Sequence, residues 1–140
     1  MIVVDTNILI YLYIQGEHTS AVESLVTIDC TWIAPLLWRS EFRNVLALYL
    51  RKKIISLQQA LDIIAQAEHL MLDNEYQPLS TSVLELVNRS SCSAYDCEFI
   101  SLAQQLNVQL ITQDRKILTE FPDHASQLMH YINKHFGTGT

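Results

Sequence analysis

The chain has 140 residues, of which 49% are hydrophobic and 17% charged, and its formal net charge is −6. This length and apolar content suit one compact domain, which we expect to span residues 1–140. The acidic balance argues against a protein that coats duplex DNA, because such proteins are usually basic. It leaves open an enzyme of nucleic acid in which metal ions and local basic segments offset charge repulsion.

The cysteines and the first residues bear on where the protein works. Cys30, Cys92 and Cys97 are odd in number and lack the CxxC spacing, which argues against a zinc site and a disulfide framework. The start, MIVVDTN, has no basic segment, and an acid comes too early for a signal peptide. The uncharged stretch 6–16 is too short to span a membrane. We therefore expect a cytoplasmic protein without membrane association.

Short apolar runs bounded by polar residues predict buried strands, and longer amphipathic stretches predict helices. In chain order, strands are expected at 2–4, 31–34, 75–78 and 108–112, and helices at 7–13, 17–27, 36–53, from 57, 80–88, 94–106, from 114 and 127–135. The sequence leaves open whether residues 124–126 form a last strand. Ser56 and Gln59 form a capping-box pattern. It begins a helix with apolar residues at Leu57, Leu61, Ile64 and Leu70. Strands that alternate with helices predict the α/β class, with a short, mainly parallel sheet of four or five strands and helices on both faces.

Four acidic residues far apart in the chain are each expected at one edge of this sheet. Asp5 and Asp114 follow the strands at 2–4 and 108–112, and Glu41 and Asp96 lie on helices that follow strands. In open α/β sheets, ligands bind outside the carboxyl ends of the strands. Taken singly, Asp5, Asp96 and Asp114 could simply cap or begin helices. Together the four acids predict a site for Mg²⁺ or Mn²⁺, which prefer oxygen ligands.

Glu41 is the least expected of these acids. On the predicted helix it shares one face with the apolar residues Leu37, Val45 and Leu48. An unpaired buried carboxylate is costly, so Glu41 is part of an ion pair, protonated, or part of a cation site. Asn44, one turn away, is a candidate for orienting it.

Polar and basic neighbours complete the predicted site. Thr6 and Asn7 are expected to hold the Asp5 carboxylate in one rotamer, and Thr112 to hydrogen-bond to Asp114 or to substrate. The candidate phosphate contacts are Arg39, Arg43, Arg115 and Lys116. The five histidines are scattered, and we interpret them as surface or structural residues.

The sequence resembles a PIN-domain nuclease, and within that group the toxins of VapBC-type toxin–antitoxin systems. The matching segments are M-I-V-V-D-T-N at the start, S-E-F-R-N-V-L at 40–46, Y-D-C-E-F-I-S-L-A at 95–103 and L-I-T-Q-D-R-K at 110–116. The resemblance implies a single PIN-like α/β/α sandwich. It also places Asp5, Glu41, Asp96 and Asp114 at the metal-binding and catalytic acidic positions, with Thr6, Asn7 and Thr112 in support.

The resemblance implies an endoribonuclease that hydrolyses RNA with Mg²⁺ or Mn²⁺, and a cognate antitoxin as partner. Metal-activated water needs no protein nucleophile. A homodimer is also expected. It agrees with an apparent surplus of apolar residues on the helices, namely 8–13, Trp38, Leu46, 48–50 and Leu57.

Three other functions remain open at this point. An aspartyl-nucleophile phosphatase usually has a second Asp two residues after the first, where this chain has Asn7, and a lysine near the late acid, for which Lys116 is a loose candidate. A signalling module of the response-regulator type needs an acceptor after a central strand, and Asp73 is the only candidate. The third is a non-catalytic interaction domain.

Overall fold

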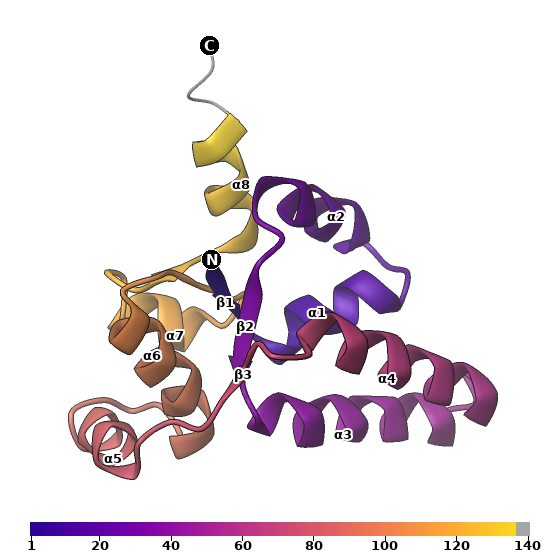
Figure 1. Cartoon of the computed structure of the whole chain (residues 1–140), viewed down its shortest axis with the longest axis horizontal. Helices are drawn as coiled ribbons and strands as arrows, with labels where there is room; N and C mark the ends of the chain where they lie inside the picture. The colour runs from indigo at the N-terminus through magenta and orange to yellow at the C-terminus, as the bar shows by residue number, and fades with distance from the viewer. Residues whose placement is uncertain (137–140) are drawn as a thin grey trace.

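Five short parallel strands form one sheet at the centre of the protein (Figure 1). The computed structural model describes residues 1–136, so the last four residues of the expected domain lie outside it. The strands are β1 (Ile2–Val4), β2 (Trp32–Pro35), β3 (Glu75–Tyr76), β4 (Leu110–Ile111) and β5 (Ala125–Ser126). This confirms the α/β class. It also answers the question left open at 124–126, because Ala125 pairs with Leu110 and Ser126 with Ile111.

Eight helices connect and cover the strands of the described chain. They are α1 (Thr6–Tyr13), α2 (Thr19–Ile28), α3 (Leu37–Arg51), α4 (Leu57–Met71), α5 (Ser80–Asn88), α6 (Ala94–Leu106), α7 (Arg115–Glu120) and α8 (Leu128–Phe136). Helices α1 to α4 lie on one side of the strands, and α5, α6 and α7 lie on the other (Figure 1). The expected sandwich of helix, sheet and helix layers is therefore present. No helix within residues 1–136 is long and apolar enough to cross a membrane.

The strand order β3-β2-β1-β4-β5 reverses direction beside β1. From β1 the chain steps outward to β2 and β3, and it then returns past β1 to β4 and β5. Parallel crossovers keep one hand, so the outward and return steps place their helices on opposite faces. The point between β1 and β4 is thus a topological switch point, where open α/β sheets hold their ligands at the carboxyl ends of the strands.

The buried face of α3 differs from the predicted one. Trp38, Phe42 and Leu46 are buried, whereas Leu48, which we had placed on the apolar face with Glu41, is 46% exposed. Trp38 and Phe42 pack edge to face, with ring centroids 5.6 Å apart, and these large aromatic side chains decide which side of α3 faces the core. Glu41 lies beside that face and is half-buried.

Helix α4 packs against the core through small side chains. Its capping box of Ser56 and Gln59 is confirmed. Its buried residues, however, are the small Ala60 and Ala67 together with Met71, while Leu57 and Leu61 are 64% and 50% exposed. Alanines let a helix approach its neighbours closely, so α4 packs through its smaller side chains and leaves these leucines outside.

Part of the predicted surplus of apolar surface is buried in the core. Ile8, Leu9 and Ile10 belong to the hydrophobic core, as do Trp38 and Leu46. Of the residues named for an interface, those that remain well exposed are Leu48 and Leu57. The remaining candidates, residues 11–13 and 49–50, are half-buried, so the homodimer stays a prediction.

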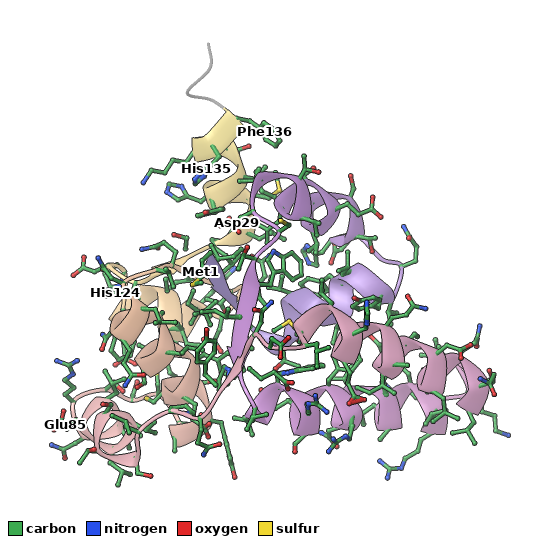
Figure 2. The ribbon with its side chains drawn as sticks, viewed as in Figure 1. Met1, Asp29, Glu85, His124, His135 and Phe136 are labelled. Atoms are coloured by element: carbon green, nitrogen blue, oxygen red, sulfur yellow. The ribbon has the colours of Figure 1, made fainter. Side chains whose placement is uncertain are left out.

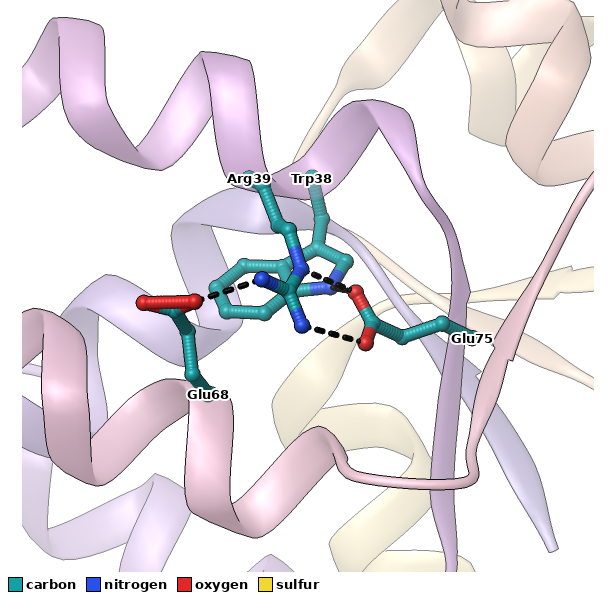
Figure 3. Close-up of polar contacts among 4 residues, drawn as sticks. All are labelled: Trp38, Arg39, Glu68 and Glu75. Carbon is teal, nitrogen blue, oxygen red and sulfur yellow. Dashed lines mark hydrogen bonds and ion pairs between the residues drawn. The ribbon is translucent and has the colours of Figure 1, made fainter.

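Arg39 joins α3 to α4 and to the edge strand β3 (Figure 3). Its Nε and Nη2 donate to the two carboxylate oxygens of Glu75 at 2.6 and 2.7 Å, and its Nη1 donates to Glu68. The indole N–H of Trp38 donates to Glu75 at 2.8 Å. The hydrogen bonds from Arg39 lower the pKa of Glu75 and hold it ionised. This cluster holds the first turn of α3 against α4 and β3. Glu41 follows that turn on the same helix.

The N-terminus is anchored at the opposite end of the strands. The ammonium group of Met1 forms an ion pair with Asp29, which follows α2, and Figure 2 shows the two residues side by side near the base of α8. Asp29 also accepts a 3.0 Å hydrogen bond from the N–H of Thr31. The start of β1 is thereby held beside β2, where Ile2 pairs with Trp32.

Candidate functional site

Asp5 occupies the switch point between β1 and β4, and each of its carboxylate oxygens has a different partner. Oδ1 accepts a 2.8 Å hydrogen bond from the backbone N–H of Thr6, because Asp5 caps α1. Oδ2 accepts a 2.7 Å hydrogen bond from the hydroxyl of Thr112, the residue after β4. Thr112 is completely buried. The carboxylate is therefore fixed in one orientation between the two central strands.

Thr112 also contacts the third element of the site. Its hydroxyl accepts a 3.1 Å hydrogen bond from the backbone N–H of Asp114. Asp114 caps α7, and its Oδ1 accepts a 3.1 Å bond from the N–H of Ile117. One buried hydroxyl thus connects the acid after β1 with the acid after β4.

Glu41 is joined to Asp5 through Thr6. The Thr6 hydroxyl donates to Glu41 Oε1 at 2.7 Å, and Thr6 is only 5% exposed. The same residue therefore presents its backbone to Asp5 and its side chain to Glu41. We had expected Asn44 to orient Glu41 and Asn7 to hold Asp5. Both asparagines are exposed, and no side-chain hydrogen bond engages either of them within residues 1–136.

Asp96 approaches from the opposite face of the sheet. It lies in the first turn of α6, where its backbone N–H donates to the capping hydroxyl of Ser93 at 3.1 Å, and its side chain is half-buried. Its charge interacts with those of Asp5, Glu41 and Asp114. The structure thus brings the four predicted acids together, with three of them linked by threonine hydroxyls and Asp96 held near them by α6.

Burial is the largest cause of the raised pKa of Asp5, Glu41 and Asp96. Neighbouring carboxylates raise these pKa values further, as Asp96 and Asp114 do for Asp5. The hydrogen bonds from Thr112 and Thr6 act in the opposite direction. Without a cation, the cluster therefore resists full ionisation, and a bound cation would relieve that repulsion.

The predicted basic residues have different surroundings. Arg39 is engaged by Glu68 and Glu75, so we no longer propose it as a phosphate contact. Arg43 lines a hollow between α3 and α4. Lys116 is exposed and lowers the pKa of Asp96, which places its ammonium group close to the acids. Arg115, its neighbour at the start of α7, is also exposed.

The contact that ties α7 to the loop before α6 was not predicted. Glu120 accepts hydrogen bonds from the backbone N–H of Ser91 at 3.1 Å, from the Ser91 hydroxyl at 2.9 Å and from the Cys92 thiol at 3.2 Å. Burial, with the nearby Glu120 carboxylate, raises the pKa of Cys92 to about 12 and keeps the thiol protonated as a donor. Lys116 donates to the carbonyl of Ser91 at 3.4 Å. These contacts connect α7, which Asp114 caps, to the loop that precedes Asp96.

The four carboxylates fit a divalent cation that also takes water and substrate phosphate as ligands. Within residues 1–136, no three Asp, Glu, His or Cys side chains are placed so that they could hold one ion together. Mg²⁺, however, keeps several waters and is commonly held by one or two carboxylates together with substrate phosphates. An all-oxygen cluster whose members already repel one another suits that coordination. Asp5, with its fixed orientation, is the best-prepared ligand.

Comparison with known proteins found one matching family model and a solved structure with a similar fold. The family model described as PIN domain matches residues 2–122. The crystal structure of PAE2754 from Pyrobaculum aerophilum is similar to this chain with a TM-score of 0.76 and 16% sequence identity, and the match covers 97% of this chain and 89% of that one. At that identity the likeness concerns the fold. No curated protein matches this sequence.

Proposed function

Because the chain belongs to the PIN-domain family, whose members are generally nucleases, we propose that it is a Mg²⁺- or Mn²⁺-dependent endoribonuclease. The observation that carries this proposal is the meeting of Asp5, Glu41, Asp96 and Asp114 at the carboxyl edge of the sheet. The four acids come from four separate segments, and two buried threonines link three of them.

The residues of this chain would divide the work of hydrolysis. When bound, the divalent cation supplies a Lewis acid and an activated water. Asp5, held by Thr6 and Thr112, offers it a carboxylate that needs no reorientation. Asp96 and Asp114 approach from the other side of the switch point and share the same charge field. Lys116 provides a positive charge near Asp96, where a phosphate oxygen would otherwise meet only carboxylates.

RNA cleavage tests the proposal. Single-stranded RNA incubated with the purified protein should be cut only when Mg²⁺ or Mn²⁺ is present, and Asp5→Asn and Asp96→Asn should each abolish cleavage. Asparagine is nearly isosteric with aspartate but loses the charge that holds the cation. Retained cleavage in both variants, free of contaminating nuclease, would overturn the assignment.

Asp73 supplies a matched control. It is exposed in the turn before β3, with a positive φ of 67°. Asparagine adopts this left-handed conformation readily, so Asp73→Asn removes one carboxylate without straining the backbone. We expect this variant to cut RNA at the wild-type rate. The same variant tests the response-regulator hypothesis, in which Asp73 would be essential, although Asp73 precedes an edge strand and does not follow a central one.

We further propose that the nuclease is the toxin of a toxin–antitoxin pair, as its resemblance to VapBC-type toxins suggests. The partner surface would lie on α3 and α4, where a hollow of about 310 Å³ opens between the helices. Leu57 and Leu61 line it and are exposed. Leu48 and Ile54 are further exposed apolar residues of this region. This exposed apolar surface supports a homodimer or an antitoxin contact.

Expression and sedimentation test the toxin proposal. The protein expressed alone should inhibit growth, and co-expression of the product of an adjacent upstream gene should relieve the inhibition and yield a stable complex. Sedimentation should show a dimer at micromolar concentration. A monomer that is harmless when expressed alone and forms no such complex removes the toxin role and leaves the nuclease proposal standing.

A further inference from the structure

A small hollow lies between the segment after β3 and the helices α5 and α6. It measures about 190 Å³ and is lined by Gln77, Pro78, Ser80, Val83, Leu84 and Glu98. Pro78 and Val83 are buried, and Leu84 is 61% exposed. The hollow is smaller than the sites that enclose drug-sized ligands, and its size suits one planar ring system.

The hollow belongs to the same edge of the sheet as the acidic cluster. All five strands are parallel, so Gln77 after β3 and Asp5 after β1 lie at the carboxyl ends of their strands. Glu98 connects the two places directly. It lines the hollow, and its carboxylate interacts electrostatically with that of Glu41. A ligand bound in the hollow would therefore extend from a group held at the acids.

Three polar side chains around the hollow have no partner in the described chain. No hydrogen bond or ion pair of residues 1–136 engages the side chains of Gln77, Ser80 or Glu98. They add an amide, a hydroxyl and a carboxylate to a lining that also contains the apolar residues Pro78, Val83 and Leu84. Apolar walls with a few convergent polar groups are the usual composition of a small-ligand site.

We propose that this hollow binds one base of the single-stranded RNA whose backbone lies at the acidic cluster, and that Glu98 selects that base. The inference rests on the proposed function. Unstacked bases of single-stranded RNA are free to enter such a hollow, and their edges are read by hydrogen bonds. The ring packs against Leu84 and Val83, and the polar side chains face its edge.

Glu98 sets the preference between the pyrimidines. A carboxylate only accepts hydrogen bonds, so it favours a base that presents an exocyclic amino group. We place Glu98 opposite ring position 4 of the base, where cytosine presents its N4 amino donor and uracil a carbonyl oxygen that the carboxylate repels. Cytosine should therefore be preferred over uracil at the position that enters the hollow.

A set of oligouridines tests the proposal. Each carries a single cytidine at a different position, and initial cleavage rates are measured with Mn²⁺. Cleavage by the wild-type protein should be fastest when cytidine stands at one fixed position relative to the broken bond, by about fivefold or more, the lower limit for a specific base contact. Glu98→Gln should make cytidine and uridine equivalent at that position, and Leu84→Ala should raise KM for both.

Glu85→Gln and Leu106→Ala are the matched controls. Glu85 lies at the outer edge of α5 (Figure 2), and Leu106 ends α6 far from Asp96. Both are exposed, and neither lines the hollow. They should keep the wild-type preference. Melting curves verify that all four variants fold, which the exposure of Leu84 and the half-burial of Glu98 favour.

The outcomes separate the two proposals. Wild-type cleavage with no preferred cytidine position, or a preference unchanged in Glu98→Gln, overturns the base site and leaves the nuclease intact. Absence of any metal-dependent cleavage by the wild-type protein overturns the proposed function and the base site with it. Loss of the preference in Glu98→Gln, with the preference kept in Glu85→Gln, supports the base site.

Discussion

Replacing Thr112 with valine removes one hydroxyl from the acidic cluster and leaves the side-chain volume nearly unchanged. That hydroxyl donates to Asp5 at 2.7 Å and accepts from the N–H of Asp114 at 3.1 Å, and Thr112 is fully buried. The substitution therefore isolates the two hydrogen bonds from any change in packing. It leaves Asp5 with the single hydrogen bond that Thr6 donates to its other carboxylate oxygen.

The expected cost follows from these contacts. A hydrogen bond to a charged group contributes about 1.5–3 kcal/mol net, and the one from a backbone N–H about 0.5–1.5 kcal/mol. The valine methyl group offsets part of this loss, so we expect Thr112→Val to lower the free energy of unfolding by about 2–3 kcal/mol. For a chain of this length that corresponds to a melting temperature lower by roughly 5–10 °C.

Thermal melts followed by circular dichroism measure the stability, and calorimetric titration with Mn²⁺ measures the effect on the metal site. Thr112→Ser is the matched control, because it keeps the hydroxyl and loses one methyl group, at a cost of about 1 kcal/mol. Mn²⁺ affinity should fall in the valine variant and persist in the serine variant. The reasoning is refuted if Thr112→Val melts at the wild-type temperature with unchanged affinity, or if serine is as damaging as valine.

Three further changes probe the charges of the site and its supports. Because burial raises the pKa of Asp5, the folded protein holds that proton at higher pH than the unfolded chain, and its metal-free stability falls as the pH rises through this range. Asp5→Asn should therefore raise the melting temperature of the metal-free protein at neutral pH. It should also remove the stabilisation by bound metal, which is about 2.7 kcal/mol at a hundredfold excess of metal over Kd. A lower melting temperature of the metal-free variant would contradict this. The pKa of Glu75 is lowered by Arg39, so that pair adds stability above the ordinary glutamate range and loses it as the pH falls through the folded pKa. Glu75→Gln should cost about 1–3 kcal/mol at pH 7, and urea titrations at several pH values should show the difference from wild type shrinking in acid; a difference independent of pH would count against the pairing. Glu120→Gln should loosen the loop before α6 and weaken Mn²⁺ binding by up to about tenfold, as calorimetry would show, whereas unchanged binding would mean that Glu120 does not position Asp96.

The acids themselves could be predicted because their placement depends on short-range patterns. Asp5 directly follows a run of three buried strand residues, and Asp114 closely follows a second buried strand. Each needs only the rule that parallel strands end at one edge of the sheet. The four- or five-stranded parallel sheet followed from the same alternation of strands and helices.

The supporting contacts could not be predicted, because they join residues distant in sequence. We chose Asn7 and Asn44 as neighbours that could orient Asp5 and Glu41. The structure uses Thr112, 107 residues from Asp5, and Thr6, 35 residues from Glu41. Thr6 and Thr112 were on the predicted list, yet their true partners required the sheet order. Only the order β2-β1-β4 places Thr112 beside Asp5.

The buried face of α3 was predicted wrongly for a different reason. On α3, the stripe through Leu48 and the stripe through Trp38 both repeat at helical spacing, and periodicity alone does not choose between them. Side-chain volume and polar partners decide which face of α3 is buried. Trp38 fills the core and also donates a hydrogen bond to Glu75. The same partner, Glu75, engages Arg39 and removes it from the candidate phosphate contacts.

The two flanks of the acidic cluster carry side chains of opposite charge. Arg39 is engaged by Glu75, whereas Lys116 on α7, after β4, is exposed and lowers the pKa of Asp96. The proposed base hollow lies on the other flank, after β3, and Glu98 contributes a carboxylate there. Strand order therefore separates a positive flank from a flank with an acceptor, with Asp5 between them. An RNA strand crossing this edge would meet the flanks unequally, because its phosphates favour the α7 side and a base with an amino group favours the β3 side. The base preference should thus fall on one side of the broken bond only, since the opposite flank offers phosphate contacts, which carry no sequence information.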